Sequence, residues 1–159
     1  LGGQESAADR SALMEILSKV PIFQFLSPQE LTGVAAGFKL QTYEPGQVIF
    51  HKDEPGTTLH VVAAGAVRIF LPAEGGEEAP LNMLKSGDYF GELSLLDGGV
   101  RTASAVAMGR TATLTLDRQD FIKFITTHPQ GAEAVFRFLA SLIRKQNMQL
   151  FGEFFDEER

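Results

Sequence analysis

The stretch from Lys39 to Leu116 alternates apolar and polar residues in short runs that are rich in β-branched side chains. Because successive side chains of a strand point to opposite faces, an apolar residue at every second position predicts a half-buried β-strand. The clearest runs of this kind are Leu59/Val61/Ala63, Val67/Ile69/Leu71 and Ala112/Leu114/Leu116. This period of two constrains the fold most, because it is incompatible with an all-helical chain.

Turn signals separate these runs roughly every ten residues, a spacing typical of rolls and barrels. The signals are Glu44-Pro45-Gly46, Glu54-Pro55-Gly56, Ala64-Gly65, Ser86-Gly87-Asp88 and Met108-Gly109. We expect type II turns at the two Pro-Gly pairs, since proline suits the first central position and glycine the second. The segment from Ala73 to Glu78 is polar and has no period, so we interpret it as an exposed hairpin loop.

Helical periodicity precedes the strand region. Between Ser11 and Val20 the apolar residues recur at three- and four-residue spacing, which predicts an amphipathic helix that Pro21 ends. The sequence Ser27-Pro28-Gln29-Glu30 has the pattern of a capping box. It predicts a second helix that begins there and ends near Phe38.

Helical periodicity also follows the strand region, first around Phe121 and then past Pro129. The second stretch carries a wide apolar stripe: Val135, Phe136, Leu139, Leu142, Ile143, Leu150 and Phe154. We therefore expect a mostly β fold with flanking α-helices, an antiparallel, jelly-roll-like β-roll with N-terminal helices and a long C-terminal helix. In this organisation residues 1–10 are a flexible segment and residues 11–159 a single domain, with helices over 11–38, the roll over 39–116 and C-terminal helices over 117–155.

The composition argues against several classes of protein. A net charge of −6 opposes a broad attraction to nucleic acid or to an anionic membrane, so any bound anion needs a local positive site. The sequence contains no run of eighteen apolar residues, which a membrane-spanning helix would need, and we expect a cytoplasmic protein. The chain begins with Leu1 rather than Met, so we expect a fragment of a longer parent. An effector domain missing from this sequence is a candidate partner.

Motifs for catalysis and metal binding are absent from the sequence. The chain has no cysteine, and His51, His60 and His128 do not form the His-x-His plus carboxylate spacing of metal-binding β-barrel enzymes. It also lacks a nucleophile elbow and a Gly-Lys-Ser/Thr phosphate loop. We therefore expect a binding module that is not an enzyme and that holds no metal or cofactor.

A short helix-compatible run, from Phe90 to Ala103, interrupts the strands. Gly91 allows a tight turn, and the first amides of the following turn, over residues 92–96, are predicted to present free N–H groups to an anion. Arg101 supplies a guanidinium that matches two phosphate oxygens, and Glu92 can accept a hydrogen bond from a neighbouring sugar hydroxyl. One arginine with oriented amides suits a ligand of one negative charge, so the run predicts a site for a monoanionic ribose phosphate.

Ordinary structural roles compete with this interpretation. Glu92 and Arg101 could form a simple salt bridge at the end of a strand, a common arrangement. Thr102 could be present for its β propensity alone. Leu84 is expected in the core more than at a ligand.

The segment from Phe90 to Ala107, FGELSLLDGGVRTASAVA, resembles the phosphate-binding cassette of the cyclic-nucleotide-binding domain family. Further similarity lies in residues 20–23 (VPIF), 43–50 (YEPGQVIF) and 86–92 (SGDYFGE), so the resemblance covers nearly the whole chain. The family includes catabolite-activator-type regulators, regulatory subunits of cyclic-nucleotide-dependent kinases and cyclic-nucleotide-gated channels. Its fold is a β-roll flanked by helices.

The resemblance implies a role for each residue of the cassette. Gly91 and Glu92 would hold the ribose 2′-hydroxyl, the amides of Leu93 and Ser94 together with Arg101 would hold the cyclic phosphate, and Ala103 would allow close approach of the next strand. The hydroxyl of Thr102 leaves both cyclic GMP and cyclic AMP open as ligands. Two residues depart from the common pattern: Val100 stands where many members have proline, and Ser94 where alanine is frequent.

The implied function is a sensor that binds cyclic AMP, cyclic GMP or both in the roll and couples binding to movement of its C-terminal helices. Leu84 is a candidate contact to the base, and Arg144 or Lys145 a candidate cap over it. A homodimer through the C-terminal helix is expected. Two alternatives remain, a degenerate member that serves only as a dimerisation or docking module and a cupin-type β-roll enzyme.

Overall fold

The computed structural model describes residues 7–73, 75 and 78–157. The contacts divide the chain into two compact units, Ala36–Lys123 and the segments Leu1–Ala35 and Phe124–Arg159. The predicted roll, residues 39–116, lies within the first unit. Among the described residues, no helix combines the length and the apolar character that crossing a bilayer requires.

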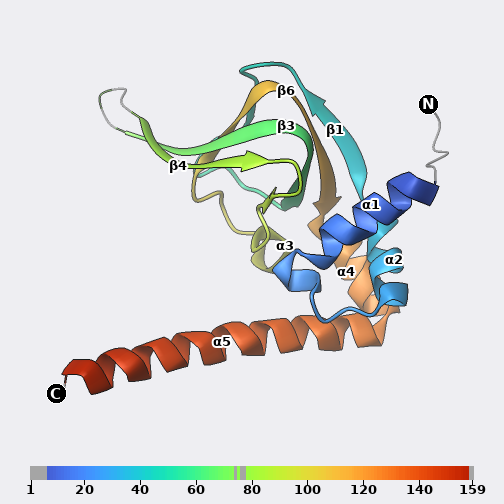
Figure 1. Cartoon of the computed structure of the whole chain (residues 1–159), viewed down its shortest axis with the longest axis vertical. Helices are drawn as coiled ribbons and strands as arrows, with labels where there is room; N and C mark the ends of the chain where they lie inside the picture. Colours follow the sequence, from blue (N-terminus) through green and yellow to red (C-terminus); the bar gives the residue numbers. More distant parts are fainter. Residues whose placement is uncertain (1–6, 74, 76–77, 158–159) are drawn as a thin grey trace. The chain divides into compact units, whose positions relative to one another are not determined.

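The first unit is a β-roll of six antiparallel strands, shown in Figure 1. The strands are β1 (Lys39–Tyr43), β2 (Val48–Phe50), β3 (Thr58–Pro72), β4 (Glu78–Lys85), β5 (Tyr89–Phe90) and β6 (Ser104–Asp117). They follow the order β1-β6-β3-β4, with β2 also paired to β6 and β5 to β3. The predicted fold class, an antiparallel roll with flanking helices, is confirmed.

Two of the predicted turns lie instead inside long strands. Gly65 belongs to β3 and Gly109 to β6, and the register of the β3–β6 pair shifts where they lie. A bulge of this kind bends a strand without ending it, which sequence alone does not distinguish from a turn. Of the two Pro-Gly pairs, Gly46 has a φ of 78° in a turn closed from Gln47 N to Glu44 O at 3.0 Å. Gly56 lacks a positive φ, so the predicted type II turn at that pair is wrong.

The apolar side chains of the alternating runs fill the interior of the roll. Val62, Val67, Leu84, Phe90 and Ala105 form a buried cluster against which three partly buried residues pack: Ile49, Phe50 and Ile69. Burying such side chains contributes about 1.5–3 kcal/mol each. Leu84, named above as a candidate base contact, lies in this core.

The second unit contains α1 (Ala7–Ser18), the short helix η1 (Pro21–Phe23), α2 (Pro28–Ala35) and α5 (Pro129–Glu157), while α4 (Arg118–Thr127) crosses the boundary between units. The capping box is confirmed, because Ser27 N donates to Glu30 Oε1 at 2.9 Å and Glu30 N to Ser27 Oγ at 3.2 Å. On the apolar face of α1 and the turn after it, Leu17 and Val20 are fully buried.

Three predicted helix boundaries are wrong. The first helix begins at Ala7 rather than Ser11, since alanines favour helix and extend it; residues 1–6 lie outside the described residues. The second ends at Ala35, three residues before Phe38, in a turn that includes Gly37. The last helix runs to Glu157 rather than to residue 155.

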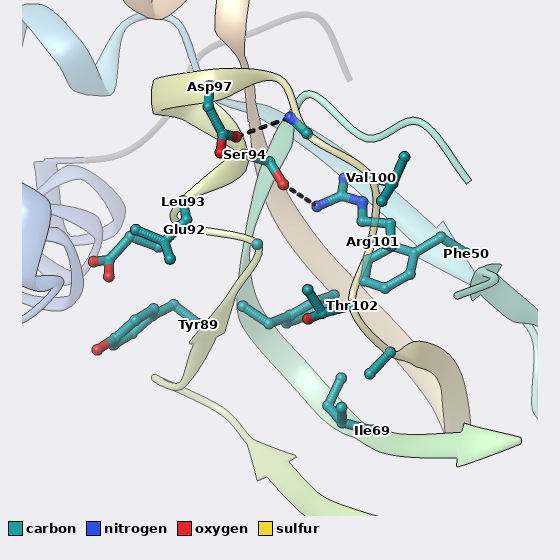
Figure 2. Close-up of a pocket in the computed structure, with 14 residues that line it drawn as sticks. Phe50, Ile69, Tyr89, Glu92, Leu93, Ser94, Asp97, Val100, Arg101 and Thr102 are labelled. Carbon is teal, nitrogen blue, oxygen red and sulfur yellow. Dashed lines mark hydrogen bonds between the residues drawn. The ribbon is translucent and has the colours of Figure 1, made fainter. Parts of the chain in front are cut away.

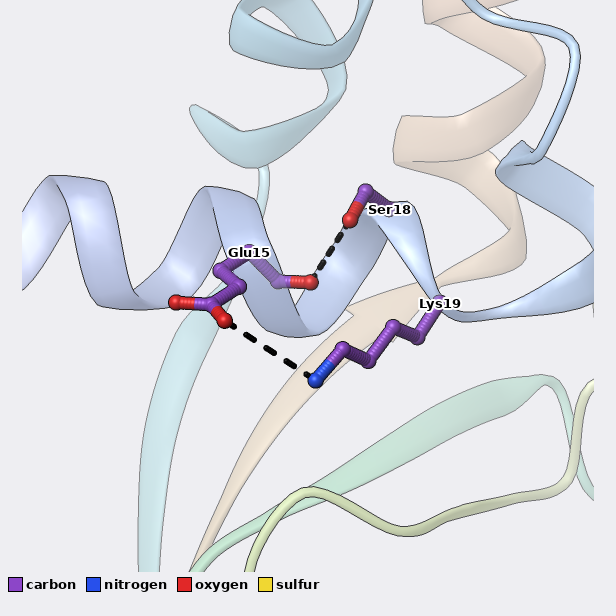
Figure 3. A network of polar contacts seen from close by, with 3 residues as sticks. All are labelled: Glu15, Ser18 and Lys19. Carbon is purple, nitrogen blue, oxygen red and sulfur yellow. Dashed lines mark hydrogen bonds and ion pairs between the residues drawn. The ribbon is translucent and has the colours of Figure 1, made fainter.

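Polar contacts close the end of α1 (Figure 3). Ser18 Oγ donates to the Glu15 carbonyl oxygen at 2.7 Å, and Lys19 Nζ lies 3.9 Å from Glu15 Oε1. Both side chains of this ion pair are more than 70% exposed, so it contributes little stability.

The long helix α5 is apolar on more than one side. Val135 and Phe138 are buried, whereas Phe136 and Ile143 are 68% and 58% exposed. The predicted stripe therefore separates into a buried part and an exposed part. Its last members, Leu150 and Phe154, have side chains outside the described residues.

Candidate functional site

A pocket of about 340 Å³ opens in the roll beside the segment between β5 and β6 (Figure 2). We call it the Arg101 pocket. It is lined by Phe50, Ile69, Tyr89, Phe90, Gly91, Glu92, Leu93, Ser94, Asp97, Gly99, Val100, Arg101, Thr102 and Ala103. The structure thus brings together all the predicted site residues of the segment from Gly91 to Ala103.

The pocket wall begins with a tight turn and one turn of helix. Gly91, directly after β5, has a φ of 80°, and the helix α3 (Ser94–Asp97) ends at Gly98. The expectation that the first amides of residues 92–96 are free is wrong in part. Ser94 N and Leu95 N each donate to a carbonyl three residues back, at 3.2 Å. A single helical turn closes such bonds within itself, so Arg101 is the strongest hydrogen-bond donor that the pocket offers to an anion.

Arg101 is 6% exposed and its guanidinium lies at the pocket wall. One terminal nitrogen donates to Ser94 Oγ at 3.2 Å and the other to the Thr58 carbonyl oxygen at 3.0 Å. The guanidinium carbon lies 4.3 Å from the centre of the Phe50 ring, a cation–π contact. The buried Nε has no hydrogen-bond partner in the described chain.

Two glycines make the space that Arg101 occupies. A Cβ on Gly56 would lie 1.9 Å from Arg101 Nε, and one on Gly91 would lie 2.6 Å from a terminal nitrogen and 2.7 Å from the Thr58 carbonyl oxygen. Side chains cannot approach so closely, so a larger residue at either position would displace the guanidinium.

No carboxylate of the described residues forms an ion pair with Arg101. Figure 2 shows the Glu92 side chain directed away from it, so the simple Glu92–Arg101 salt bridge does not form. Burial lowers the pKa of Arg101, and the smaller attraction of Glu54 acts in the opposite direction. Desolvation of this cation costs free energy that Glu54 offsets only in part, and an entering anion would recover more of it.

The opposite rim of the pocket has a negative character. The pKa of Tyr89 is raised, first by burial and then by the charges of Glu92 and Asp88. In Figure 2 Tyr89 and Glu92 lie on the same side of the pocket, opposite Arg101. The pocket thus has a cationic wall facing an acidic, hydroxyl-bearing one, an arrangement that suits a phosphate next to a sugar.

Two predicted contacts are not among the described residues that line the pocket. Leu84 is in the core cluster and does not line the pocket. Arg144 is exposed on α5, in the unit that does not contain the pocket, and its role as a cap stays a prediction, as does that of Lys145. Thr102 lines the pocket and is exposed.

Sequence reasoning missed three residues that position Arg101: Phe50, Gly56 and Thr58. All lie more than forty residues before it, and no local spacing connects them to it. The one available signal was the Pro55-Gly56 pair, which we interpreted as a turn.

A second cavity, of about 330 Å³, lies on the roll and shares no lining residue with the first. We call it the His60 cavity. It is lined by Lys39, Gln41, Tyr43, Thr58, His60, Thr115, Asp117 and Asp120. Two of its polar side chains have partners in the chain: Thr115 Oγ1 donates to the Lys39 carbonyl oxygen, and Asp117 Oδ1 accepts a hydrogen bond from Thr57 Oγ1 at 2.6 Å.

His60 lies between the two cavities in the packing of the roll. Its ring stacks on Phe90 with centroids 4.7 Å apart, and Nδ1 lies 3.3 Å from Thr113 Oγ1. Burial lowers the pKa of His60 to about 3, and the Arg101 charge adds to this. The imidazole is therefore neutral near pH 7. The described residues contain no group of three side chains that could hold a metal ion.

Comparisons with known proteins agree with this geometry. Residues 40–128 match the family described as "Cyclic nucleotide-binding domain". The chain is 38% identical over 139 residues to the cyclic AMP receptor protein of Thermus thermophilus, covering 87% of this chain and 64% of that protein. It is 38% identical over 117 residues to a cGMP-dependent protein kinase of Caenorhabditis elegans, covering 72% of this chain and 15% of the kinase.

A solved structure shares the fold over most of its length. The N-terminal domain of a transcriptional regulator from Streptomyces coelicolor superposes with a TM-score of 0.79 and 30% identity, covering 85% of this chain and 94% of that one. The chain spans less than two thirds of the length of the curated relatives named above. With a match over residues 40–128 and the pocket formed by its cassette, the chain belongs to the cyclic nucleotide-binding domain family and is a regulatory domain of that kind.

Proposed function

We propose that the Arg101 pocket binds cyclic AMP, cyclic GMP or both, and that binding is coupled to the C-terminal helices. The observation that carries the proposal is Arg101 itself, a 6% exposed cation at a pocket wall without a carboxylate partner. A cyclic phosphate carries one negative charge, which matches one guanidinium. Ser94 Oγ and the adjacent backbone would complete the phosphate contacts, and Glu92 would accept a hydrogen bond from the ribose 2′-hydroxyl.

The base preference depends on Thr102 in this proposal. Its hydroxyl is exposed at the pocket and can donate to the phosphate or bond to a guanine folded over it. The similarity extends to a relative named for cyclic AMP and to one named for cGMP. A Thr102→Ala variant that loses affinity for cyclic GMP more than for cyclic AMP would assign the hydroxyl to guanine.

Arg118 supports the proposed coupling. It is the first residue of α4, and one of its terminal nitrogens donates to the Leu96 carbonyl oxygen at 3.2 Å. Leu96 belongs to α3, the helical turn in the pocket wall. A ligand that shifts α3 would therefore pull on the start of the C-terminal helices, provided that it binds one arrangement more tightly than the other.

The exposed apolar residues of α5 support a homodimer. Phe136 and Ile143 are seven residues apart, so they lie on one side of the helix, and both are more than half exposed. A second copy of α5 would cover them. We also propose that this domain has no catalytic activity of its own and that, in a cytoplasmic protein, it passes its signal to an effector domain outside this sequence.

Titration with cyclic AMP and cyclic GMP, followed by calorimetry and thermal unfolding, tests the binding proposal. We expect saturable binding that raises the melting temperature, since a ligand specific for the native state stabilises it by mass action. Arg101→Met keeps an apolar stem beside Phe50 but removes the charge, and should cost about 2–5 kcal/mol of binding free energy. Arg110→Met, an exposed arginine of the same roll, is the matched control and should bind normally.

The same titration distinguishes the alternatives. A folded wild-type protein that binds neither nucleotide, and that is dimeric by light scattering, would instead be a docking module. Equal affinity of the Arg101→Met and wild-type proteins would show that the pocket is not the site. A metal-dependent activity would favour a cupin-type enzyme.

Hydrogen exchange tests the coupling separately from binding. Ligand should increase protection of α4 in the wild type. In Arg118→Met the affinity should remain within about threefold while that protection is lost, because the variant lacks the bond to Leu96. Arg137→Met, on the exposed side of α5, is the control. Unchanged protection in Arg118→Met would show that the bond to Leu96 does not transmit the coupling, and absence of ligand-dependent protection of α4 in the wild type would contradict the coupling itself.

A further inference from the structure

The carboxylate of Asp97 is a feature of the pocket that the proposed function does not use. Asp97 ends α3 and lines the Arg101 pocket. Its Oδ1 accepts a hydrogen bond from Gly99 N at 2.8 Å, which holds the loop that leads to Arg101 (Figure 2). That bond requires only an oxygen acceptor, and an asparagine would supply one equally well.

The negative charge of Asp97 is therefore not needed for the turn. The described residues give Asp97 no ion pair. Arg118, whose side chain lies beside Gly98 at the same end of α3, donates to the Leu96 carbonyl oxygen and does not line the pocket. Arg101 is the only cation among the fourteen described residues that line the pocket, and it lies on the Ser94 side. The lining thus carries one cation, Arg101, and two carboxylates, Glu92 and Asp97, and Asp97 has no ion pair among the described residues.

This distribution distinguishes ligands by charge. A cyclic phosphodiester is a monoanion, which Arg101 neutralises. The 5′-monophosphate of the same nucleoside has a second pKa near 6 and so carries almost two negative charges above pH 7. Its second charge would meet no further cation in the pocket and would be repelled by Asp97 through Coulomb forces that water screens only in part.

We propose that the carboxylate of Asp97 is a specificity determinant that makes the pocket select a cyclic nucleotide over the corresponding 5′-monophosphate. The inference rests on the proposed function, since it concerns the same pocket. The selectivity lets the domain respond to the cyclic ester and ignore the product of its hydrolysis.

Asp97→Asn tests this directly, because it removes the charge and keeps the acceptor for Gly99 N. Affinities for cyclic AMP and 5′-AMP are measured at pH 8 by calorimetry and by displacement of a fluorescent cyclic nucleotide, and likewise for the guanine pair. The dissociation constant of the 5′-monophosphate divided by that of the cyclic nucleotide should fall by about three- to tenfold, mainly because the 5′-monophosphate binds more tightly. Melting curves establish that the variant is folded.

Asp117→Asn is the matched control. Asp117 Oδ2 accepts a hydrogen bond from the backbone two residues on, Gln119 N at 3.4 Å, so the substitution makes the same change of charge at a similar turn, but Asp117 does not line the pocket. Its ratio should stay within about twofold of the wild type. An unchanged ratio in Asp97→Asn, or an equal fall in Asp117→Asn, would overturn the inference while binding of the cyclic nucleotide still stood. Failure of the wild type to bind any cyclic nucleotide would overturn the proposed function itself.

Discussion

The Arg101 pocket and the His60 cavity have nearly the same volume, about 340 and 330 Å³, but their polar groups are used in opposite ways. In the Arg101 pocket a desolvated cation faces open space with its Nε unbonded. At the His60 cavity two lining residues bond to one buried hydroxyl beneath them, because both His60 Nδ1 and the Tyr43 hydroxyl lie within hydrogen-bond distance of Thr113 Oγ1.

This difference shows that the volume of a cavity does not by itself identify a ligand-binding site. A polar network that satisfies itself specifies the fold and has little to offer a ligand. A buried charge without a counter-ion costs the folded protein free energy and is kept where a ligand can compensate it. Substitutions should therefore act on binding in the first region and on stability in the second.

The largest effect is expected from Gly56→Ala, which fills the space of the Arg101 side chain. The new Cβ would lie 1.9 Å from Nε and 2.5 Å from both Cδ and Cζ, so the guanidinium must move. We expect affinity for the cyclic nucleotide to fall about a hundredfold in calorimetry. The roll should remain folded, because the far end of the flexible Arg101 side chain can shift. Affinity within threefold of the wild type would show that this space is not required.

The second prediction concerns the pH dependence that His60 confers on stability. Its folded pKa of about 3 lies below the unfolded value of 6.5, so the unfolded state takes up the proton first as the pH falls. Stability is full above pH 6.5 and declines below it, by about 2 kcal/mol between pH 7 and pH 5. Urea unfolding at the two pH values measures this. His60→Phe should remove most of the difference, whereas the exposed control His51→Phe should retain it.

The smallest effect is expected from Thr113→Val, which keeps the shape of a fully buried side chain and removes its hydroxyl. His60 Nδ1 would lose its partner, at a cost of about 1 kcal/mol of unfolding free energy. Thr42→Val on the exposed face of β1 should change stability by less than about 0.5 kcal/mol. Binding of the cyclic nucleotide should be unchanged in both; a loss of affinity in Thr113→Val would mean that the two regions are not independent.

Much of the site could be predicted from the sequence, because its residues are close together in the chain. Gly91, Glu92, Ser94 and Arg101 lie within one short segment, and they meet in one pocket. The capping box at Ser27 and Glu30 was equally local and formed as expected. Local patterns such as these depend on neighbouring backbone, which any fold of the segment retains.

The bulges and the helix ends were harder to predict from the sequence. A glycine such as Gly65 has the same local signal in a turn and in a strand bulge, and only pairing with β6 decides between them. The first helix was predicted from Ser11 rather than Ala7 because the apolar spacing that indicates it begins only at Leu13, whereas Ala7 and Ala8 favour helix without adding to that spacing.

By itself, the sequence determined the period of the strands, the helices around them and the charged group at the pocket. The tertiary structure alone decided the surroundings of that group. Phe50, Gly56 and the Thr58 carbonyl reach Arg101 because the paired strands of the roll bring distant segments together. The physical reason is that desolvation and counter-ion absence are properties of a three-dimensional environment, so whether an arginine is a surface charge or a buried site for an anion is not written in its neighbours along the chain.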